Sequence, residues 1–206
     1  MSEVADAVAA IRAGGIVVIP TDTVYGLACS PERPEAVRAL AELKGRAPEQ
    51  PIALVASSVE RLLECVPELR GPAAALVRRL LPGPYTLVLP NPSGRYAWLT
   101  GNRPDAIGVR VPAASGAGAA VLEQVGAIAA TSANRHGDPD PRRLEDVPDG
   151  ILEAVAAAVD AGELPGTPST VLDLTGEEPR VLREGAVPAH EALGRVASSR
   201  GVDRRE

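Results

Sequence analysis

Aromatic side chains are scarce in this sequence. They make up 2% of the residues, and Phe is missing altogether. Proteins that hold single-stranded nucleic acid usually stack the bases on aromatic side chains, so this mode of binding is nearly excluded. The net charge of −6 also argues against a surface that binds nucleic acid as a whole, although it permits a local basic groove.

Cysteine and histidine are scarce as well. The two cysteines, Cys29 and Cys65, lie in separate apolar segments, which excludes a disulfide framework and a cysteine-based metal site. We expect both thiols to be buried and reduced. His136 and His190 lie in predicted loops, where a histidine is usually solvated. The sequence therefore predicts no resident metal ion.

Long apolar runs are also missing. None reaches the roughly 18 residues that a membrane-spanning helix needs. Asp6 and Arg12 interrupt the first apolar residues, so we expect no cleavable signal peptide. With 206 residues, the chain is long enough to bury a core without disulfides or metals. These features predict a soluble cytoplasmic protein.

Three well-known enzyme motifs do not occur. The sequence has no Gly-x-Ser-x-Gly elbow, no Gly-x-x-x-x-Gly-Lys-Ser/Thr loop and no Gly-x-Gly-x-x-Gly. An activated protein nucleophile is therefore poorly supported. If the chain is an enzyme, we expect it to hold reactants together and to neutralise their charge.

Helical and strand patterns alternate along the chain. Helices are predicted at residues 3–13, 34–45, 58–65 and 71–80 and around Val121. Apolar runs predict strands near residues 15–20, 52–56, 85–89, 107–111, 128–131, 156–160, 169–174 and 180–182. The late strands follow one another too closely for a purely parallel sheet. We therefore expect a single-domain α/β fold with a twisted mixed sheet, flanking helices and a concave ligand cleft. The polar, proline-rich residues 132–148 are expected to form a mobile lid.

Two threonines follow the first predicted strand. Its apolar run ends at Pro20, and Thr21-Asp22-Thr23 comes directly after it. Ligands of open α/β sheets bind beyond the carboxyl ends of strands, so the threonines are candidate ligand contacts. An ordinary Ser/Thr/Asp turn explains the segment equally well.

Two later segments repeat this pattern. Thr131-Ser132-Ala133-Asn134 follows a predicted strand, and Ser169-Thr170 opens another. Small hydroxyl and amide groups at these positions suit a phosphate, a ribose or a carboxylate. The commoner role of such a tetrad is an N-cap or an Asx turn, and the Ser-Thr pair alone has low specificity.

Four cations lie at the ends of predicted elements. Lys44-Gly45-Arg46 ends a helix, Arg110 comes shortly before a strand-ending Pro, and Arg183 precedes Gly185. Two cations separated by Gly can converge on one anion, but their spacing alone favours an interaction with the helix C-terminus. Arg110 lies either on the solvent face of its strand or in a cleft, and the nearby Pro favours the cleft.

These segments together match one family. In chain order they are Pro20-Thr-Asp-Thr-Val-Tyr-Gly26, Lys44-x-Arg46 followed by Pro51, Pro82-Gly-Pro-Tyr-Thr86, Val109-Arg-Val-Pro112, Ser132-x-Asn134, Ser169-Thr-Val171 and Leu182-Arg-Glu-Gly185. From about Gly14 to Gly185 the sequence resembles the YrdC/TsaC family of threonylcarbamoyl-AMP synthases, in its stand-alone form. The resemblance implies a YrdC-like catalytic domain at residues 1–187 and a tail at 188–206 that is a weak helix or disordered.

The resemblance also implies a reaction. Members of the family make threonylcarbamoyl-adenylate and pyrophosphate from L-threonine, bicarbonate or CO2, and ATP, which enters with Mg²⁺. The adenylate is the precursor of threonylcarbamoyladenosine in tRNA, so the implied partners are the proteins that transfer the group to tRNA. Weak contact with tRNA or double-stranded RNA is an additional expectation.

Residue roles follow from the matched motifs. The resemblance makes Lys44 and Arg46 the catalytic cations. It assigns ATP binding to Lys44, Arg46, Gln50, Ser132, Asn134, Asp140 and Arg183. It assigns threonine binding to Thr23, Arg110, Thr131 and Ser169. It provides no dedicated metal ligand, so Mg²⁺ would be held mainly by the substrate phosphates.

The sequence departs from the family at a few positions. Val55 and Ala114 lie where many members have His, which bears on amino-acid selectivity, and Asp140 lies where a small hydroxyl residue often approaches ATP. One alternative is a non-catalytic paralogue that binds double-stranded RNA or ribosomal particles. Another is a carbamoyl-transfer domain like that of hydrogenase-maturation proteins, but the zinc-finger-like cysteines of that context are missing.

Overall fold

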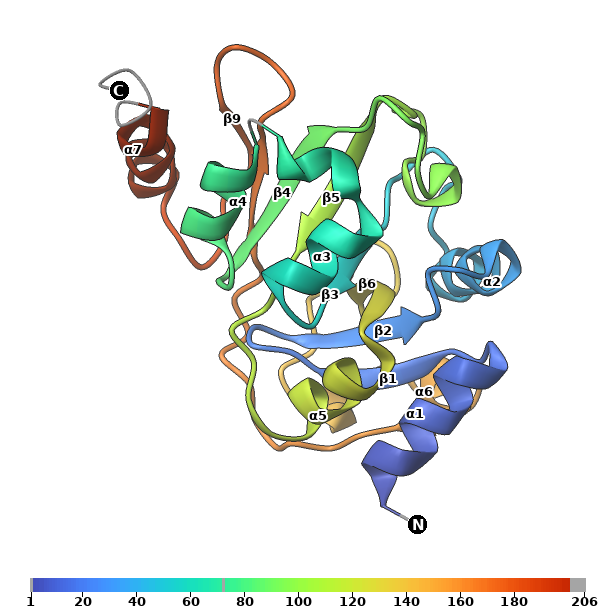
Figure 1. Cartoon of the computed structure of the whole chain (residues 1–206). Coiled ribbons are helices and arrows are strands. Elements are labelled where there is room, and N and C mark those ends of the chain that lie inside the picture. The colour runs from blue at the N-terminus through green and yellow to red at the C-terminus, as the bar shows by residue number, and fades with distance from the viewer. Residues whose placement is uncertain (1, 72, 201–206) are drawn as a thin grey trace.

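A mixed β-sheet forms the centre of the computed structural model, which describes residues 2–71 and 73–200 (Figure 1). Within those ranges nine strands lie in the order β7-β1-β2-β6-β3-β5-β4-β8-β9. Their bounds are β1 Val17–Pro20, β2 Tyr25–Cys29, β3 Ala53–Ala56, β4 Tyr85–Pro90, β5 Ala106–Arg110, β6 Ala127–Ser132, β7 Ala157–Ala158, β8 Thr170–Asp173 and β9 Arg180–Arg183. The pairs β1·β7, β3·β5 and β4·β8 are parallel, and the other neighbours are antiparallel. The predicted α/β fold with a mixed sheet is confirmed.

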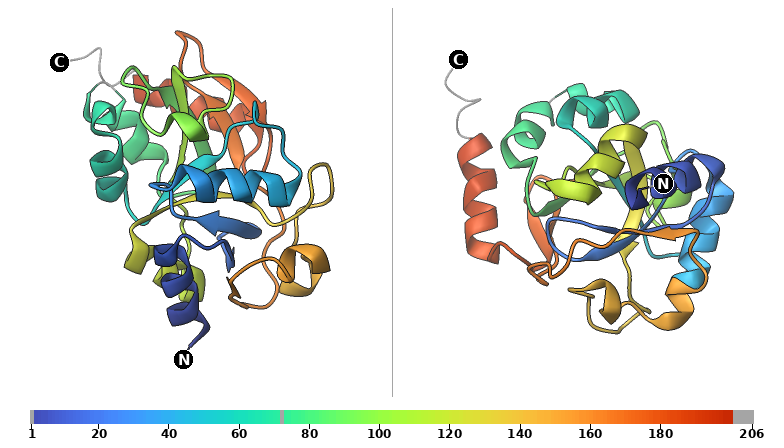
Figure 2. Two further views of the ribbon diagram at one scale, coloured as in Figure 1. Left: turned by 90° about the vertical axis from the view of Figure 1, so that its right-hand side faces the viewer. Right: turned by 90° about the horizontal axis from the view of Figure 1, so that it is seen from below.

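Helices cover both faces of this sheet. Their bounds are α1 Glu3–Ala13, α2 Pro34–Lys44, α3 Val59–Cys65, α4 Ala74–Leu80, α5 Gly116–Val125, α6 Asp149–Leu152 and α7 Ala189–Arg200, with 3-10 turns η1 Pro67–Arg70, η2 Ala97–Leu99 and η3 Leu144–Asp146. Helices α1 and α5 pack together over β7, β1 and β6, whereas α2 and α3 pack on β2 and β3 from the opposite face (Figure 2). In the part of the chain that is described, no helix is both long and apolar enough to cross a membrane.

The alternation of side chains along the strands divides the core in two. Val17 and Ile19 of β1 belong to the apolar cluster beneath α1 and α5, whereas Val18 belongs to the larger cluster on the other face. In β3, Val55 belongs to the cluster beneath α1 and α5, and Leu54 belongs to the larger cluster. Successive strand residues point to opposite faces, so β1 and β3 each contribute to both clusters.

The sequence interpretation missed one strand. Residues Tyr25–Cys29 form β2, which pairs antiparallel with β1 and is buried along its whole length. Only the short turn at residues 21–24 separates the two strands. The sequence predicts a turn that follows a strand at residues 21–24. In the structure these residues form the loop of the β-hairpin between β1 and β2.

The C-terminal segment contributes to the core. The predicted helix is α7, which packs against α4 and buries Ala192 and Val196 completely (Figures 1 and 2). The division of the chain at residue 187 remains a prediction, and the predicted frayed end at 201–206 lies outside the described residues.

Helix α5 approaches β1 so closely that a methyl group does not fit between them. A Cβ atom built on Gly118 would lie 1.9 Å from the carbonyl oxygen of Pro20. We predict that Gly118→Ala lowers the free energy of unfolding by at least about 1–3 kcal/mol, because α5 must move away from β1. In α7, Gly194→Ala is the control: its Cβ would contact nothing within 4 Å, and it should raise stability by up to about 1 kcal/mol. Urea denaturation checks both, and an unchanged Gly118→Ala variant would contradict the close approach.

Candidate functional site

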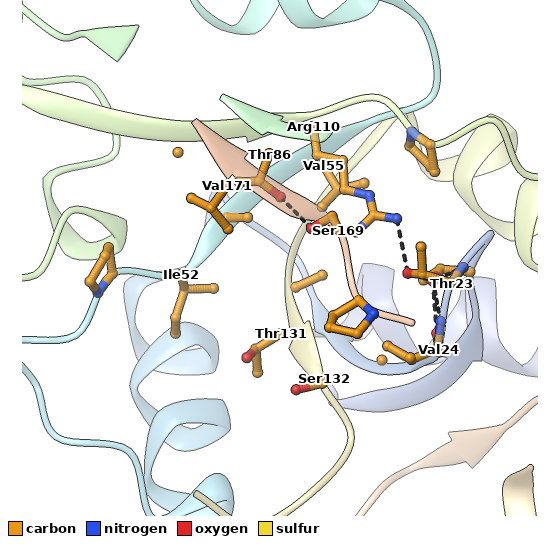
Figure 3. Close-up of a pocket in the computed structure, with 18 of the residues that line it drawn as sticks. Thr23, Val24, Ile52, Val55, Thr86, Arg110, Thr131, Ser132, Ser169 and Val171 are labelled. Atoms are coloured by element: carbon orange, nitrogen blue, oxygen red, sulfur yellow. Dashed lines mark hydrogen bonds between the residues drawn. The ribbon is translucent and has the colours of Figure 1, made fainter. Parts of the chain in front are cut away.

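A cavity of about 330 Å³ opens on the face of the sheet that carries α1 and α5. One row of side chains crosses five strands along its wall. Leu87 pairs with Val109, so Thr86 and Arg110, the next residues along these strands, face the same side. Thr86 pairs with Val171, Arg110 with Val55, and Val55 with Ile128. These five residues all line the cavity, and four of them are labelled in Figure 3.

Small residues form the floor of the cavity beside this row. Val88 pairs with Gly108, and Ala53 pairs with Ala130, on the same face of the sheet. A Cβ atom on Gly108 would meet only the methyl group of Thr86, at 3.9 Å. The sheet is therefore hollow here because its side chains are short, and α1 and α5 do not fill the space.

Arg110 is held at one end of the cavity by Asp22. One oxygen of the Asp22 carboxylate accepts a hydrogen bond from Arg110 Nη2, and the other accepts from the backbone N–H of Ala113 at 3.0 Å. The same Nη2 donates to Thr23 Oγ1 at 3.0 Å (Figure 3). The Arg110 side chain is 11% exposed and that of Asp22 10%. Across the described residues, Arg110 Nε and Nη1 have no protein acceptor.

The two threonines of the β1–β2 loop have different roles. Thr21 Oγ1 accepts from the backbone N–H groups of Thr23 and Val24 at 3.2 Å and donates to Val24 O at 2.7 Å. This pattern is the ordinary turn that we weighed as an alternative. Thr23 is buried at the cavity wall beside Arg110, in the place expected for a ligand contact. The turn is therefore confirmed for Thr21, whereas a ligand contact at Thr23 stays a prediction.

A second polar group lies on β4 and β8. Thr86 Oγ1 and Ser169 Oγ are 2.9 Å apart (Figure 3). Arg183 Nη2 donates to the carbonyl oxygen of Ser169 at 2.9 Å and to its hydroxyl at 3.3 Å. Thr170 points away from the cavity, and its hydroxyl donates to Val187 O at 2.7 Å. Of the Ser-Thr pair, Ser169 belongs to the site and Thr170 to the core.

Arg46 connects β6 to the segment just before β3 at the cavity wall. Its Nη1 donates to Thr131 Oγ1 at 3.2 Å, and its Nη2 donates to Pro51 O at 2.6 Å. Burial, and then the positive charge of Arg183, lower the pKa of Arg46 from its usual value. Positive charge is thus concentrated at this part of the cavity, which suits an anion.

Lys44 is buried behind the wall and does not line the cavity. It is 3% exposed, and its Nζ donates to the carbonyl oxygens of Ser132 and Asn134 at 2.7 and 3.1 Å. It also contacts Ser132 Oγ at 3.2 Å and Asn134 Oδ1 at 2.5 Å. The cation therefore binds the end of β6 and does not cap its own helix, so the interaction that spacing alone favours is wrong for Lys44.

Burial is also the largest cause of an altered pKa at Lys44. It lowers the pKa of the ammonium group to about 8, and the charge of Arg46 adds to this effect, while Asp140 opposes it. Because the folded-state pKa lies below the usual 10.5, charged Lys44 costs folding free energy at neutral pH. This cost falls as the pH rises from about 8 towards 10.5.

Ser132 and Asn134 are held in a tight turn. The hydroxyl of Ser132 donates to Asn134 Oδ1 at 2.7 Å, and Asn134 Nδ2 donates to Asp138 O at 2.5 Å. Ser132 lines the cavity, whereas Asn134 is 6% exposed and lies behind it. Asn134 thus has the turn role that we named as the commoner alternative for this tetrad.

The structure brings most of the predicted residues together. Those that line the cavity are Thr23, Arg46, Arg110, Thr131, Ser132, Asp140, Ser169 and Arg183. Lys44, Gln50 and Asn134 do not line it, and Gln50 Nε2 is 3.4 Å from His136 Nε2. Within the described ranges, the carboxylate of Asp140 has no hydrogen-bond partner, and no group of three His, Cys, Asp or Glu side chains could hold a metal ion.

Sequence reasoning missed two residues of the site. Asp22 lay inside the Thr-Asp-Thr motif without a role, and Thr86 ended the Pro-Gly-Pro-Tyr-Thr motif. The signal for Thr86 was the alternation in Tyr85-Thr-Leu-Val-Leu89, which places Thr86 on the face opposite the buried Tyr85 and Leu87. Nothing in the sequence indicated that Asp22 contacts a residue 88 positions away.

We predict that removal of the Asp22 carboxylate destabilises the protein. Asp22→Ala leaves a nearly buried guanidinium group without its counter-ion and should lower the free energy of unfolding by about 3 kcal/mol. The matched control is Glu60→Ala, which breaks the exposed Arg78–Glu60 pair and should change stability little. Urea denaturation measures both. Equal effects of the two substitutions would contradict the structural role of Asp22.

We also predict that anion binding weakens as Lys44 loses its charge. The affinity for inorganic triphosphate should fall severalfold as the pH rises through about 8, because the cavity wall loses a positive charge. Lys44→Met, if folded by circular dichroism, should bind more weakly at neutral pH and show no such fall. Calorimetric titration provides the affinities, and a pH-independent affinity of the wild type would contradict this role.

Comparisons with known proteins identify related chains. A family model described as Sua5/YciO/YrdC, telomere recombination, matches residues 9–185. The threonylcarbamoyl-AMP synthase of Pyrococcus abyssi is 37% identical over 182 residues, which are 88% of this chain and 53% of that protein. A putative threonylcarbamoyl-AMP synthase of Mycobacterium tuberculosis is 35% identical over 201 residues, 97% of this chain and 90% of that protein.

A solved structure extends the similarity to the fold. The crystal structure of P. abyssi Sua5 complexed with L-threonine matches with a TM-score of 0.85 and 34% identity, over 95% of this chain and 58% of that one. This chain thus spans little more than half of the Pyrococcus protein. The match to the family model covers most of the described residues, including the whole cavity wall. The chain belongs to the Sua5/YciO/YrdC family.

Proposed function

We propose that the chain is an L-threonylcarbamoyladenylate synthase. It would be a nucleotidyltransferase that forms threonylcarbamoyl-AMP and pyrophosphate from L-threonine, bicarbonate or CO2, and ATP. One observation carries the proposal: a single cavity joins Thr23, Arg110 and Ser169 to Arg46 and Arg183. Relatives named threonylcarbamoyl-AMP synthase, and a relative crystallised with L-threonine, support it.

The carboxylate of threonine would bind at Arg110. The guanidinium group is positioned by Asp22 and Thr23, while its Nη1 has no acceptor among the residues described. A carboxylate is the partner that a guanidinium group binds most strongly. Thr131 and Ser169 line the same cavity and would complete the amino-acid pocket.

The triphosphate of ATP would bind along the cationic part of the wall. Arg46 and Arg183 line the cavity there, and the charge of Lys44 lies directly behind Ser132. Gln50 and Asn134 would act from behind this wall, because neither lines the cavity. These cations would neutralise the charge that develops when pyrophosphate leaves.

The substrates supply every nucleophile of this reaction. The amine of threonine attacks CO2 and loses a proton to form a carbamate. A carbamate oxygen then attacks the α-phosphorus of ATP, and the bond to the β-phosphate oxygen breaks to release pyrophosphate. The protein contributes position and charge, in agreement with the absence of a nucleophile motif from the sequence.

Mg²⁺ would enter with ATP and neutralise the phosphates when bound. Asp140 is the carboxylate that fits this ion, since it lines the cavity and has no hydrogen-bond partner among the described residues. Carboxylate and phosphate oxygens are the ligands that Mg²⁺ prefers. We propose that the phosphates provide most of its coordination, and that a protein that modifies tRNA accepts the product in the cytoplasm.

The direct test is incubation with ATP, Mg²⁺, bicarbonate and single amino acids. We expect pyrophosphate release that depends on both threonine and bicarbonate, and a threonylcarbamoyl-adenylate product in mass spectrometry. Release that requires neither compound would reject the proposal.

We further predict that Arg46→Ala lowers this turnover at least about 100-fold, because a cation at the transferring phosphate is lost. Arg78→Ala, which removes an exposed arginine from the Arg78–Glu60 pair, should leave turnover unchanged. Thermal melting verifies that both variants are folded. Turnover of Arg46→Ala close to that of the wild type would contradict the assignment of Arg46.

A further inference from the structure

We propose that Thr86 is a specificity-determining residue that recognises the side-chain hydroxyl of threonine, together with Ser169. The opposite side of Arg110, formed by Val55 and Ile128, would contact the methyl group. The site would then distinguish L-threonine from L-allo-threonine and L-valine. This inference rests on the proposed function and specifies the substrate of the same site.

The row of residues across the sheet carries the argument. Arg110 lies in its middle, with Thr86 on the neighbouring strand β4 and Val55 on the other neighbour, β3. The backbones of neighbouring strands are about 4.8 Å apart, so Thr86 and Val55 each lie one strand spacing from Arg110, on opposite sides. The substrate therefore has a polar neighbour on one side and an apolar neighbour on the other.

On the polar side, the hydroxyl groups of Thr86 and Ser169 can form further hydrogen bonds. A hydroxyl group donates one hydrogen bond and accepts two. In the contact between Thr86 and Ser169, one of the two hydroxyl groups donates a hydrogen bond to the other. Arg183 donates a second hydrogen bond to the hydroxyl oxygen of Ser169. One O–H and further acceptor sites remain without partners in the described structure. A substrate hydroxyl, which is both donor and acceptor, matches this remainder (Figure 3).

The other side offers only carbon atoms. Val55 pairs with Ile128 across β3 and β6, and both line the cavity while being almost fully buried. Leu122 and Ile19 extend this apolar wall towards α5 and β1. A methyl group gains from burial there, whereas a hydroxyl group would lose its hydrogen bonds to water.

This arrangement has a stereochemical consequence. Cβ of threonine carries one hydroxyl and one methyl, and L-allo-threonine exchanges their positions. In the same pose, L-allo-threonine would place its hydroxyl on Val55 and its methyl on the Thr86–Ser169 pair. L-valine would leave that pair unsatisfied. We expect kcat/KM for either compound to be on the order of 100-fold below that for L-threonine. For serine, which lacks the methyl, the loss should be about 10- to 200-fold.

The test compares three variants with the four amino acids. Thr86→Val should lower the threonine-to-valine ratio of kcat/KM about 10- to 100-fold, mainly through slower threonine turnover. Thr86→Ser retains the hydroxyl and should keep most of the ratio. Thr100→Val alters another threonine of the cavity wall, whose hydroxyl donates to Ala97 O, and should leave the ratio unchanged. Calorimetric binding of threonine and valine without ATP provides a second readout, and thermal melting verifies folding.

The outcomes separate this inference from the proposed function. If the wild type neither binds threonine nor releases pyrophosphate with it, the proposed function is wrong, and this inference with it. If threonine is used but L-allo-threonine or valine is used equally well, only this inference is overturned. An unchanged threonine-to-valine ratio in folded Thr86→Val, in both turnover and binding, also overturns it.

Discussion

The ammonium group of Lys44 is the interaction on which the cavity wall depends. It joins the end of α2 to the end of β6 through four oxygen atoms of Ser132 and Asn134. A buried charge is expensive unless it is hydrogen-bonded, so these oxygens cannot move independently of α2. The same helix leads directly to Arg46, which binds β6 through Thr131. The position of the wall that carries Arg46 is therefore set by one buried cation.

The hollow beside this wall arises from ordinary strand geometry. Alternate residues of β3, β4 and β5 fill the core on one face, and their neighbours line the cavity on the other. The neighbours include Gly108 and Ala53, which are too small to fill the space. No special backbone conformation is needed for such a site. A sheet whose second face is only partly covered by helices is sufficient.

The sequence predicted the elements and most of the site for physical reasons that can be named. Apolar periodicity identified α1 and α2, and the motifs identified residues that converge although they lie far apart in the chain. Strand β2 was missed because its apolar run follows a hydroxyl-rich turn that we interpreted as the end of a strand and not as the loop of a hairpin. The burial of Lys44 was not foreseen, since spacing does not show which way a side chain points. Asp22 was missed because its partner depends on tertiary structure.

The floor of the cavity has a consequence for redesign. A side chain added at Gly108 would extend into the hollow, because its first carbon meets only a methyl group at ordinary contact distance. Larger residues at this position would therefore shrink the binding volume stepwise without displacing a polar group of the wall. Natural variation at a single codon could adjust the size of the accepted compound in the same way. The size of the accepted compound would then be separable from the charges of the cavity wall.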